Sequence, residues 1–300
     1  MKSFTLCNGV DIPVIGIGPA GMPAVKGFSG RDIFSRVLRK YYAAPKVRRD
    51  YISAVAAAIS SGYRLIDFAA IYGDGAYIAD AIDKANVPRK DIFLTGRISN
   101  KAQFAGPNAV KDQIRLMLDQ YRTDYVDLLM FHWPVPKHYE ETWMVLCEAH
   151  EQGLARSIGV ANCNRPHLER LMKCGLKPMV NQFEVHPLFT QKPLVGFCKD
   201  NSIQVEAYTA IARFDFRLMG RPALKHIAEV HGKTPVQVVL RWHIQNGVVP
   251  VVRSLNPNRQ KENLDIFDFE LSASEMGTID GLNINSRLRH DPDNCDFTIL

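Results

Sequence analysis

The sequence predicts an α/β fold, a (β/α)₈ TIM barrel in which parallel strands alternate with helices. Short apolar runs rich in β-branched residues recur along the chain, and longer amphipathic stretches separate them. Alternation of this kind is typical of parallel strands joined by right-handed crossovers, and eight such units favour a closed barrel. A chain of 300 residues fits a single barrel domain over 1–300, since this class commonly runs to ~250 residues.

The barrel strands are preceded by a predicted hairpin. Asn8-Gly9 lies between the apolar segments 4–6 and 12–15, and Asn-Gly between two apolar runs is a strong hairpin signal. The eight barrel strands are expected at 14–17, 64–68, 92–95, 126–131, 157–160, 179–184, 204–208 and 248–252. We therefore expect an N-terminal β-hairpin followed by one closed sheet.

Helical patterns fill the intervals between the strands. Residues 110–121 place one apolar face at three- and four-residue spacing, formed by Val110, Ile114, Met117, Leu118 and Tyr121. Ser272 and Glu275 have the spacing of a capping box, which predicts the start of a helix that Gly281 can end.

Residues 19–49 do not fit this repeat. Glycine and proline are frequent in the first half, and a basic amphipathic stretch follows at 33–40. We interpret the segment as a long loop with one short helix, inserted after the first barrel strand. Loops that follow barrel strands lie on the catalytic face, so the insertion is either a lid or substrate wall, or a solvated excursion.

An open, doubly wound sheet is the alternative fold. It carries Gly-x-Gly-x-x-Gly between a strand and a helix, and the nearest match here is Gly16-Ile17-Gly18-Pro19-Ala20-Gly21. The proline and the position at the start of the chain make this match poor, so the barrel is preferred.

Composition narrows the possible functions. The net charge is +6, but no nucleic-acid-binding motif accompanies the basic residues, so we expect no nucleic-acid partner. No apolar run is long enough for a transmembrane helix, and the first residues lack the pattern of a secretory peptide. The six cysteines include no Cys-x-x-Cys pair. We therefore expect reduced thiols, no metal site, no membrane partner and a cytoplasmic location.

Polar residues stand where several predicted strands end. Asp67 ends the second strand, Arg97 follows the third and His132 follows the fourth, while Tyr72 comes five residues after Asp67. Because strand ends meet at one mouth of a barrel, these side chains are expected to face one pocket. Taken singly, each can equally be structural, as a helix cap, a packing residue, a surface ion pair or a buried histidine. Their common placement favours catalysis.

This set of residues suits the reduction of a carbonyl group. Hydride addition leaves an alkoxide, which needs a proton donor and a positive potential. A free tyrosine hydroxyl has a pKa of about 10, and a neighbouring cation lowers it. A carboxylate can hold that cation in place.

Motifs along almost the whole chain, apart from 19–49, resemble those of the aldo-keto reductases. They are Asn8-Gly9, Ile12-Pro13 and Ile15-Gly16-Ile17-Gly18; Gly62-Tyr63-Arg64-Leu65-Ile66-Asp67-Phe68-Ala69 with Tyr72-Gly73; Phe131-His132-Trp133-Pro134; Ser157-Ile158-Gly159-Val160-Ala161-Asn162; Asn181-Gln182-Phe183-Glu184-Val185-His186-Pro187; Ala207-Tyr208-Thr209; and Pro250-Val251-Val252-Arg253-Ser254 with Arg259, Glu262 and Asn263. The short loops and Asp291-Pro292-Asp293 resemble bacterial members such as the diketogluconate reductases.

The resemblance implies a catalytic tetrad, which here is Asp67, Tyr72, Arg97 and His132. Tyr72 would protonate the carbonyl oxygen, and His132 would orient the substrate. The family has lysine where this chain has Arg97. Both side chains are positively charged, but arginine is longer and planar, and it can grip a carboxylate through two nitrogens. An activity weakened or altered by Arg97 is therefore expected.

The resemblance also implies a site for the nicotinamide end of NADPH/NADP⁺. Asn162 and Gln182 would bind the carboxamide, and Tyr208 would stack on the ring. The loop that contains Thr209 and Ile211 would pass near the pyrophosphate.

The phosphate and adenine end of the implied site lies near the end of the last barrel strand. Arg253, Ser254 and Arg259 match the family's binding site for the 2′-phosphate, which favours NADPH over NADH, and Asn263 would meet the adenine. Trp133 and Phe104 are expected in the wall of the substrate pocket.

The sequence features are compatible with two functions. The first is NADPH-dependent reduction of a small-molecule aldehyde or ketone, with Tyr72 as general acid. The second is a nicotinamide-cofactor-binding sensor or interaction protein with little turnover, suggested by Arg97 and by Ala161 in place of the usual family serine. The first is preferred, since a loss of catalysis does not explain the presence of Asp67, Tyr72 and His132. We expect a monomer or weak dimer.

Overall fold

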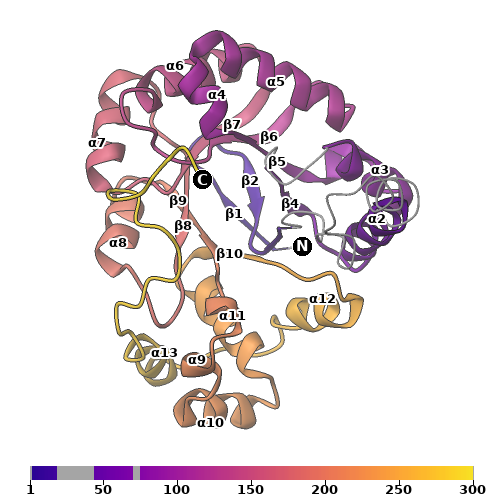
Figure 1. Ribbon diagram of the computed structural model, residues 1–300. Coiled ribbons are helices and arrows are strands. Elements are labelled where there is room, and N and C mark those ends of the chain that lie inside the picture. Colours follow the sequence, from indigo (N-terminus) through magenta and orange to yellow (C-terminus); the bar gives the residue numbers. More distant parts are fainter. Residues whose placement is uncertain (1, 19–43, 70–74, 300) are drawn as a thin grey trace, which may run out of the picture.

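The computed structural model describes residues 2–18, 44–69 and 75–299. Within them, eight parallel strands close into a barrel in the order β10-β3-β4-β5-β6-β7-β8-β9, and helices surround it (Figure 1). The barrel strands are β3 (Gly16–Ile17), β4 (Leu65–Asp67), β5 (Phe93–Ile98), β6 (Val126–Phe131), β7 (Ala155–Ala161), β8 (Val180–Glu184), β9 (Gln204–Tyr208) and β10 (Val248–Val252). The predicted fold class and the eight predicted strands are confirmed.

The helices follow the strands along the chain. They are α2 (Ala44–Ser60), α3 (Ala76–Ala85), η3 (Arg89–Asp91), α4 (Asn100–Ala105), α5 (Pro107–Tyr121), α6 (Tyr139–Glu151), α7 (Arg165–Cys174), α8 (Lys192–Asp200), η4 (Ala212–Phe214), α9 (Phe216–Met219), α10 (Pro222–His231), α11 (Pro235–Gln245), α12 (Pro257–Leu264) and α13 (Ala273–Asp280). The predicted apolar face of α5 is buried. The predicted capping box opens α13, with Ser272 at the N-cap and Gly281 at the C-cap.

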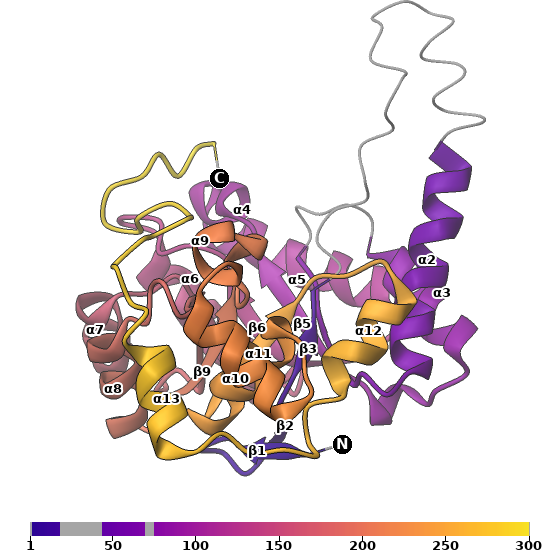
Figure 2. The ribbon, with the colours of Figure 1, turned by 90° about the horizontal axis from the view of Figure 1, so that it is seen from below.

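The N-terminal hairpin is also confirmed. Strand β1 (Ser3–Thr5) pairs antiparallel with β2 (Asp11–Pro13), and the turn between them includes Gly9 at φ 84°. Figure 2 shows the hairpin lying across one end of the barrel, with the C-terminus towards the other end. Leu6 and Ile12 are buried in one cluster with Leu65 and Phe93 from the barrel strands. The hairpin therefore fills one end of the barrel with apolar side chains.

The barrel interior changes character from one end to the other. Near the hairpin it is apolar, with Leu65 and Phe93 pointing inwards. Two positions further along β4 stands Asp67, and four positions further along β5 stands Arg97, both buried. Side chains two or four apart on a strand share a face, so the polar residues lie on the same inner surface, nearer the carboxyl ends.

The predicted boundary of the insertion needs correction. Helix α2 begins at Ala44, so residues 44–49 are helical and not part of a loop. Tyr51, Val55 and Ile59 are buried at four-residue spacing and fix the helix on the barrel. The preceding turn is charged and exposed, with Arg48 paired to Asp80 at 2.9 Å, and it therefore resembles a loop in sequence. The rest of the predicted insertion, 19–43, lies outside the described residues.

Two findings bear on partners. Among the helices of the described residues, none has both the length and the apolar character needed to cross a membrane. The described ranges also hold no group of three or more His, Cys, Asp or Glu side chains that could bind a metal ion.

Candidate active site

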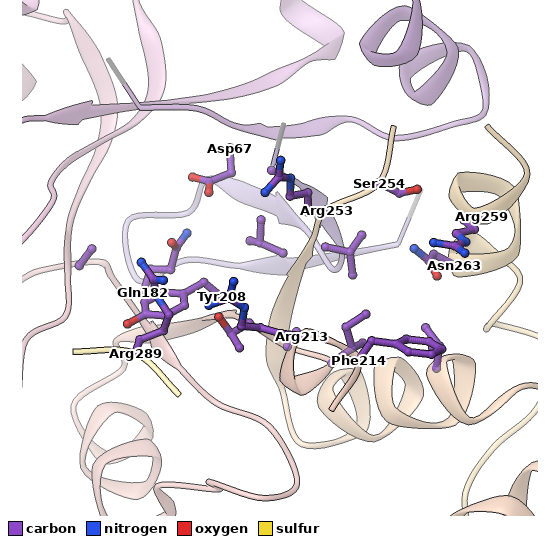
Figure 3. Close-up of a pocket in the computed structure, with 18 of the residues that line it drawn as sticks. Asp67, Gln182, Tyr208, Arg213, Phe214, Arg253, Ser254, Arg259, Asn263 and Arg289 are labelled. Atoms are coloured by element: carbon purple, nitrogen blue, oxygen red, sulfur yellow. The ribbon is translucent and has the colours of Figure 1, made fainter. Parts of the chain in front are cut away.

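A cavity of about 1280 Å³ opens at the carboxyl ends of the barrel strands. The predicted site residues that line it are Asp67, Arg97, His132, Trp133, Asn162, Gln182, Tyr208, Thr209, Ile211, Arg253, Ser254, Arg259 and Asn263. Figure 3 shows Gln182 and Tyr208 at one side of the cavity and Ser254, Arg259 and Asn263 at the opposite side. Residues far apart in sequence are thus gathered around one space, as strand ends in a barrel require.

Two predicted residues are missing from the described part of the cavity lining, for different reasons. Tyr72 lies in the segment 70–74, outside the described residues. Phe104, on α4, packs edge-on against His138 with ring centroids 5.6 Å apart, and 43% of its surface is exposed. A role for Phe104 in the substrate wall therefore has no support from the described part of the cavity.

Asp67 and Arg97 form a buried ion pair beside the cavity. Nη2 of Arg97, on β5, donates to Oδ1 of Asp67 on β4. The same nitrogen donates a hydrogen bond of 2.6 Å to Oε1 of Gln182 on β8. Because β6 and β7 separate β5 from β8 in the sheet, the guanidinium crosses the barrel interior. It therefore binds Gln182 as well as Asp67.

His132 carries no charge at physiological pH. Part of its surface faces the cavity, but loss of hydration and the positive charges of Arg97 and Arg289 lower its pKa to about 3. The main-chain carbonyl of His132 accepts a 2.9 Å hydrogen bond from Nδ2 of Asn162, and its amide donates to Ile98 O at 3.0 Å. The ring can therefore exchange hydrogen bonds with a ligand, but it adds no charge.

Tyr208 and Asn162 hold one another at the ends of neighbouring elements. The Tyr208 hydroxyl, at the end of β9, donates to Oδ1 of Asn162 at 2.6 Å. Asn162 follows β7 and adopts φ 60°, a left-handed conformation that asparagine tolerates better than most residues. The nitrogen and the oxygen of the Asn162 side-chain amide thus both align strand ends around the cavity.

The far side of the cavity is basic. Arg253, which follows β10, and Arg259, on α12, are both exposed and line the cavity. Oδ1 of Asn256 accepts hydrogen bonds from the amides of Asn258 at 2.9 Å and Arg259 at 3.3 Å, which fixes the start of α12. Exposed guanidinium groups on adjoining elements can bind an anionic group such as phosphate.

The loop after β9 has an unusual backbone. Thr209, Ala212, Arg213 and Phe214 all have positive φ, between 49° and 63°, although none is glycine. Nε2 of His243 hydrogen-bonds to Ala210 O at 2.8 Å and ties the loop to α11. This conformation carries Arg213 and Phe214 into the cavity wall. The sequence pattern did not predict it.

The C-terminal segment forms a wall that sequence analysis missed. Arg289 and His290 line the cavity, and Figure 3 shows Arg289 beside Gln182 and Tyr208. The buried Glu184 carboxylate accepts hydrogen bonds from the amides of Leu288 at 2.7 Å and Arg289 at 3.0 Å. The basic run at 287–290 is the sequence signal that could have drawn attention to this wall.

Comparison with known proteins identifies the family. The sequence model of a family described as "Aldo/keto reductase family" matches residues 39–284. The chain belongs to the aldo/keto reductase family. This membership assigns it to carbonyl reduction in general terms, and it confirms the resemblance found in the sequence motifs.

Similar aldo/keto reductases include two proteins of Bacillus subtilis. The chain is 36% identical over 298 residues to the uncharacterized oxidoreductase YtbE, covering 98% of this chain and 97% of that protein. It is 41% identical over 245 residues to glyoxal reductase, covering 81% and 87%. Among solved structures, a variant of Gox0644 in complex with NADPH matches with a TM-score of 0.85 and 30% identity, over 98% of each chain.

Proposed function

We propose that this aldo/keto reductase reduces an aldehyde or ketone to an alcohol with NADPH, and that Tyr72 is the general acid. One observation carries the proposal. A single cavity joins the polar cluster of Asp67, Arg97 and His132 at the strand ends to an exposed basic region at Arg253 and Arg259. A reducing dinucleotide needs both parts, because its phosphates and its reacting ring lie at opposite ends.

The residues around the cavity fit NADPH. Arg253 and Arg259 are exposed cations that would hold the 2′-phosphate, and this favours NADPH over NADH. Asn162 and Gln182 would bind the carboxamide beside the Tyr208 ring. When bound, the dinucleotide supplies a hydride. The NADPH complex of the Gox0644 variant and the glyoxal reductase of B. subtilis support this assignment by similarity.

The protein's own residues would manage the proton. Arg97 would lower the pKa of the Tyr72 hydroxyl through its positive charge, and Asp67 would hold Arg97 in place. The neutral His132 ring would hydrogen-bond the carbonyl oxygen and orient it towards the acid. Because Arg97 also binds Gln182, its charge lies beside the proposed carboxamide site.

The test compares two phenylalanine substitutions. In Tyr72→Phe, kcat/KM for a reactive aldehyde should fall at least about a hundredfold, because general acid catalysis is lost. NADPH affinity, followed by fluorescence, should stay within about threefold. Tyr77→Phe is the matched control, since Tyr77, on α3, packs under Arg48 of α2 and is not among the described residues that line the cavity. Equal loss of NADPH absorbance with the wild type and Tyr72→Phe would disprove the acid assignment.

A second function is favoured by one feature. Arg97 shares a nitrogen between Asp67 and Gln182, which could hold it away from the acid and leave a cofactor-binding sensor or interaction protein with little turnover. That function predicts NADPH binding without NADPH consumption across aldehydes, ketones and dicarbonyl compounds. A large gain of turnover in Arg97→Lys would then identify arginine as the cause.

A further inference from the structure

Glu206 is a buried acid that sequence analysis did not single out. It lies in the middle of β9, fully buried, between Val205 and Ala207, which pack outwards against the helices. Its own side chain therefore points into the barrel. In the sheet it stands opposite Gln182 on one side and Val249 on the other. It is not among the described residues that line the cavity.

Glu206 is the end of a continuous polar chain across the barrel. Nε2 of Gln182 donates to Oε2 of Glu206 at 2.8 Å, and Oε1 of Gln182 accepts from Nη2 of Arg97 at 2.6 Å. Arg97 in turn binds Asp67. An arginine only donates hydrogen bonds, so the amide oxygen of Gln182 must face Arg97. The amide nitrogen must then face Glu206, which accepts.

This arrangement fixes what Gln182 can offer to a ligand. A glutamine amide has two N–H groups and two oxygen lone pairs. One of each is directed to Glu206 and Arg97, and the second of each remains for a molecule in the cavity that Gln182 lines. Without Glu206 the buried amide nitrogen would lose its acceptor, and the amide would no longer be held from both ends.

We propose that Glu206 is a positioning residue for the cofactor, holding the Gln182 amide in the orientation that binds the nicotinamide carboxamide. The proposal rests on the proposed function. Glu206 would act through Gln182 and would not touch the cofactor.

The charge of Glu206 matters for the same network. Burial and the nearby Asp67 carboxylate raise the pKa of Glu206 to about 8. Among the described residues, the charged groups that face it are Asp67 on β4 and Arg97 on β5; β8 presents the neutral Gln182, and β10 has no titratable residue. While Glu206 is protonated, it adds no charge to the Asp67–Arg97 ion pair. Deprotonation of Glu206 would add a negative charge near Arg97 and weaken the positive potential available to the acid.

The experiment measures NADPH binding and the pH profile in matched variants. Glu206→Leu removes the acceptor and should weaken NADPH binding about tenfold, measured by fluorescence without any carbonyl substrate. Glu206→Gln keeps an acceptor oxygen, so its affinity should stay within about threefold of wild type. Gln204→Leu is the control: Gln204 lies two residues away on β9 and donates to Gly247 O at 2.8 Å, not to Gln182. Circular dichroism checks that each variant is folded.

Two further measurements separate positioning from a general structural effect. In a Gln182→Ala background, Glu206→Leu should weaken NADPH binding no further, because the route through the amide is gone. Wild-type reductase activity should fall as the pH rises through about 8, and this fall should be absent in Glu206→Gln. Unchanged NADPH affinity in Glu206→Leu would overturn the positioning role of Glu206 and leave the proposed function standing. The same would follow if Glu206→Leu weakened NADPH binding as much in the Gln182→Ala background as in the wild type. Failure of the wild type to bind NADPH would overturn the proposed function with it.

Discussion

Nη2 of Arg97 lies 2.6 Å from Oε1 of Gln182, although two barrel strands separate the strands that carry them. A long planar side chain makes this contact possible while the same nitrogen binds Asp67. The ion pair and the proposed carboxamide site are therefore parts of one network. Four predictions test this network and the wall beside it.

The Asp67–Arg97 pair should be strongly coupled in stability. Arg97→Met leaves the Asp67 carboxylate buried without its cation, which should lower the free energy of unfolding by about 3–5 kcal/mol. Adding Asp67→Asn should restore part of that loss, because no buried charge then remains. Denaturant unfolding of the two single variants and the double variant measures the coupling. Additive losses would show that the two side chains are energetically independent.

Glu206 should make stability depend on pH in a defined direction. Its pKa is about 8 in the folded protein and about 4.3 in an unfolded chain. Between these values the folded state retains a proton that the unfolded state has lost, so this contribution to stability is complete below about pH 4.3 and is lost as pH rises through about 8. Relative to wild type, Glu206→Gln should therefore gain thermal stability as the pH is raised over this interval. A constant difference in Tm would contradict the raised pKa.

Arg289 should favour substrates that carry a negative charge. It is exposed in the cavity wall near His132, whose pKa it helps to lower. In Arg289→Met, kcat/KM for para-carboxybenzaldehyde should fall about tenfold, and that for para-nitrobenzaldehyde less than about threefold. Arg287→Met is the control, since Arg287 stacks on Phe189 and does not line the cavity. An equal change with both aldehydes would argue against charge recognition.

Glu184 should hold the C-terminal wall in place. Its buried carboxylate accepts the amides of Leu288 and Arg289, so Glu184→Ala should release the segment that carries Arg289. We expect the KM for the carbonyl substrate to rise about tenfold while NADPH affinity changes little. Limited proteolysis should cut the C-terminal segment faster than in wild type. Unchanged proteolysis and KM would mean that other contacts suffice to hold it.

The barrel and most of the site could be predicted because their signals are local. Runs such as Val248–Val252 are apolar and short, and Asp67 and His132 stand at or directly after strand ends. A barrel then brings such ends together regardless of their separation in the chain.

The missed features depend on contacts between distant segments. Glu206 in sequence is one acid within an apolar strand, and its role becomes visible only when Gln182 is placed opposite it. Arg289 reaches the cavity because Glu184, more than a hundred residues earlier, holds its amide at 3.0 Å. Helix α2 starts earlier than predicted, since its exposed charged turn lacks apolar periodicity.

The small hairpin at the amino-terminal end of the strands also affects the kinetics. Because Leu6 and Ile12 fill that end, the described part of the barrel receives both reactants through the opposite mouth. A reactant that lay deeper in the cavity than the other would have to arrive first and leave last. Product inhibition should therefore follow a compulsory order, imposed by a pair of three-residue strands remote from the reacting atoms.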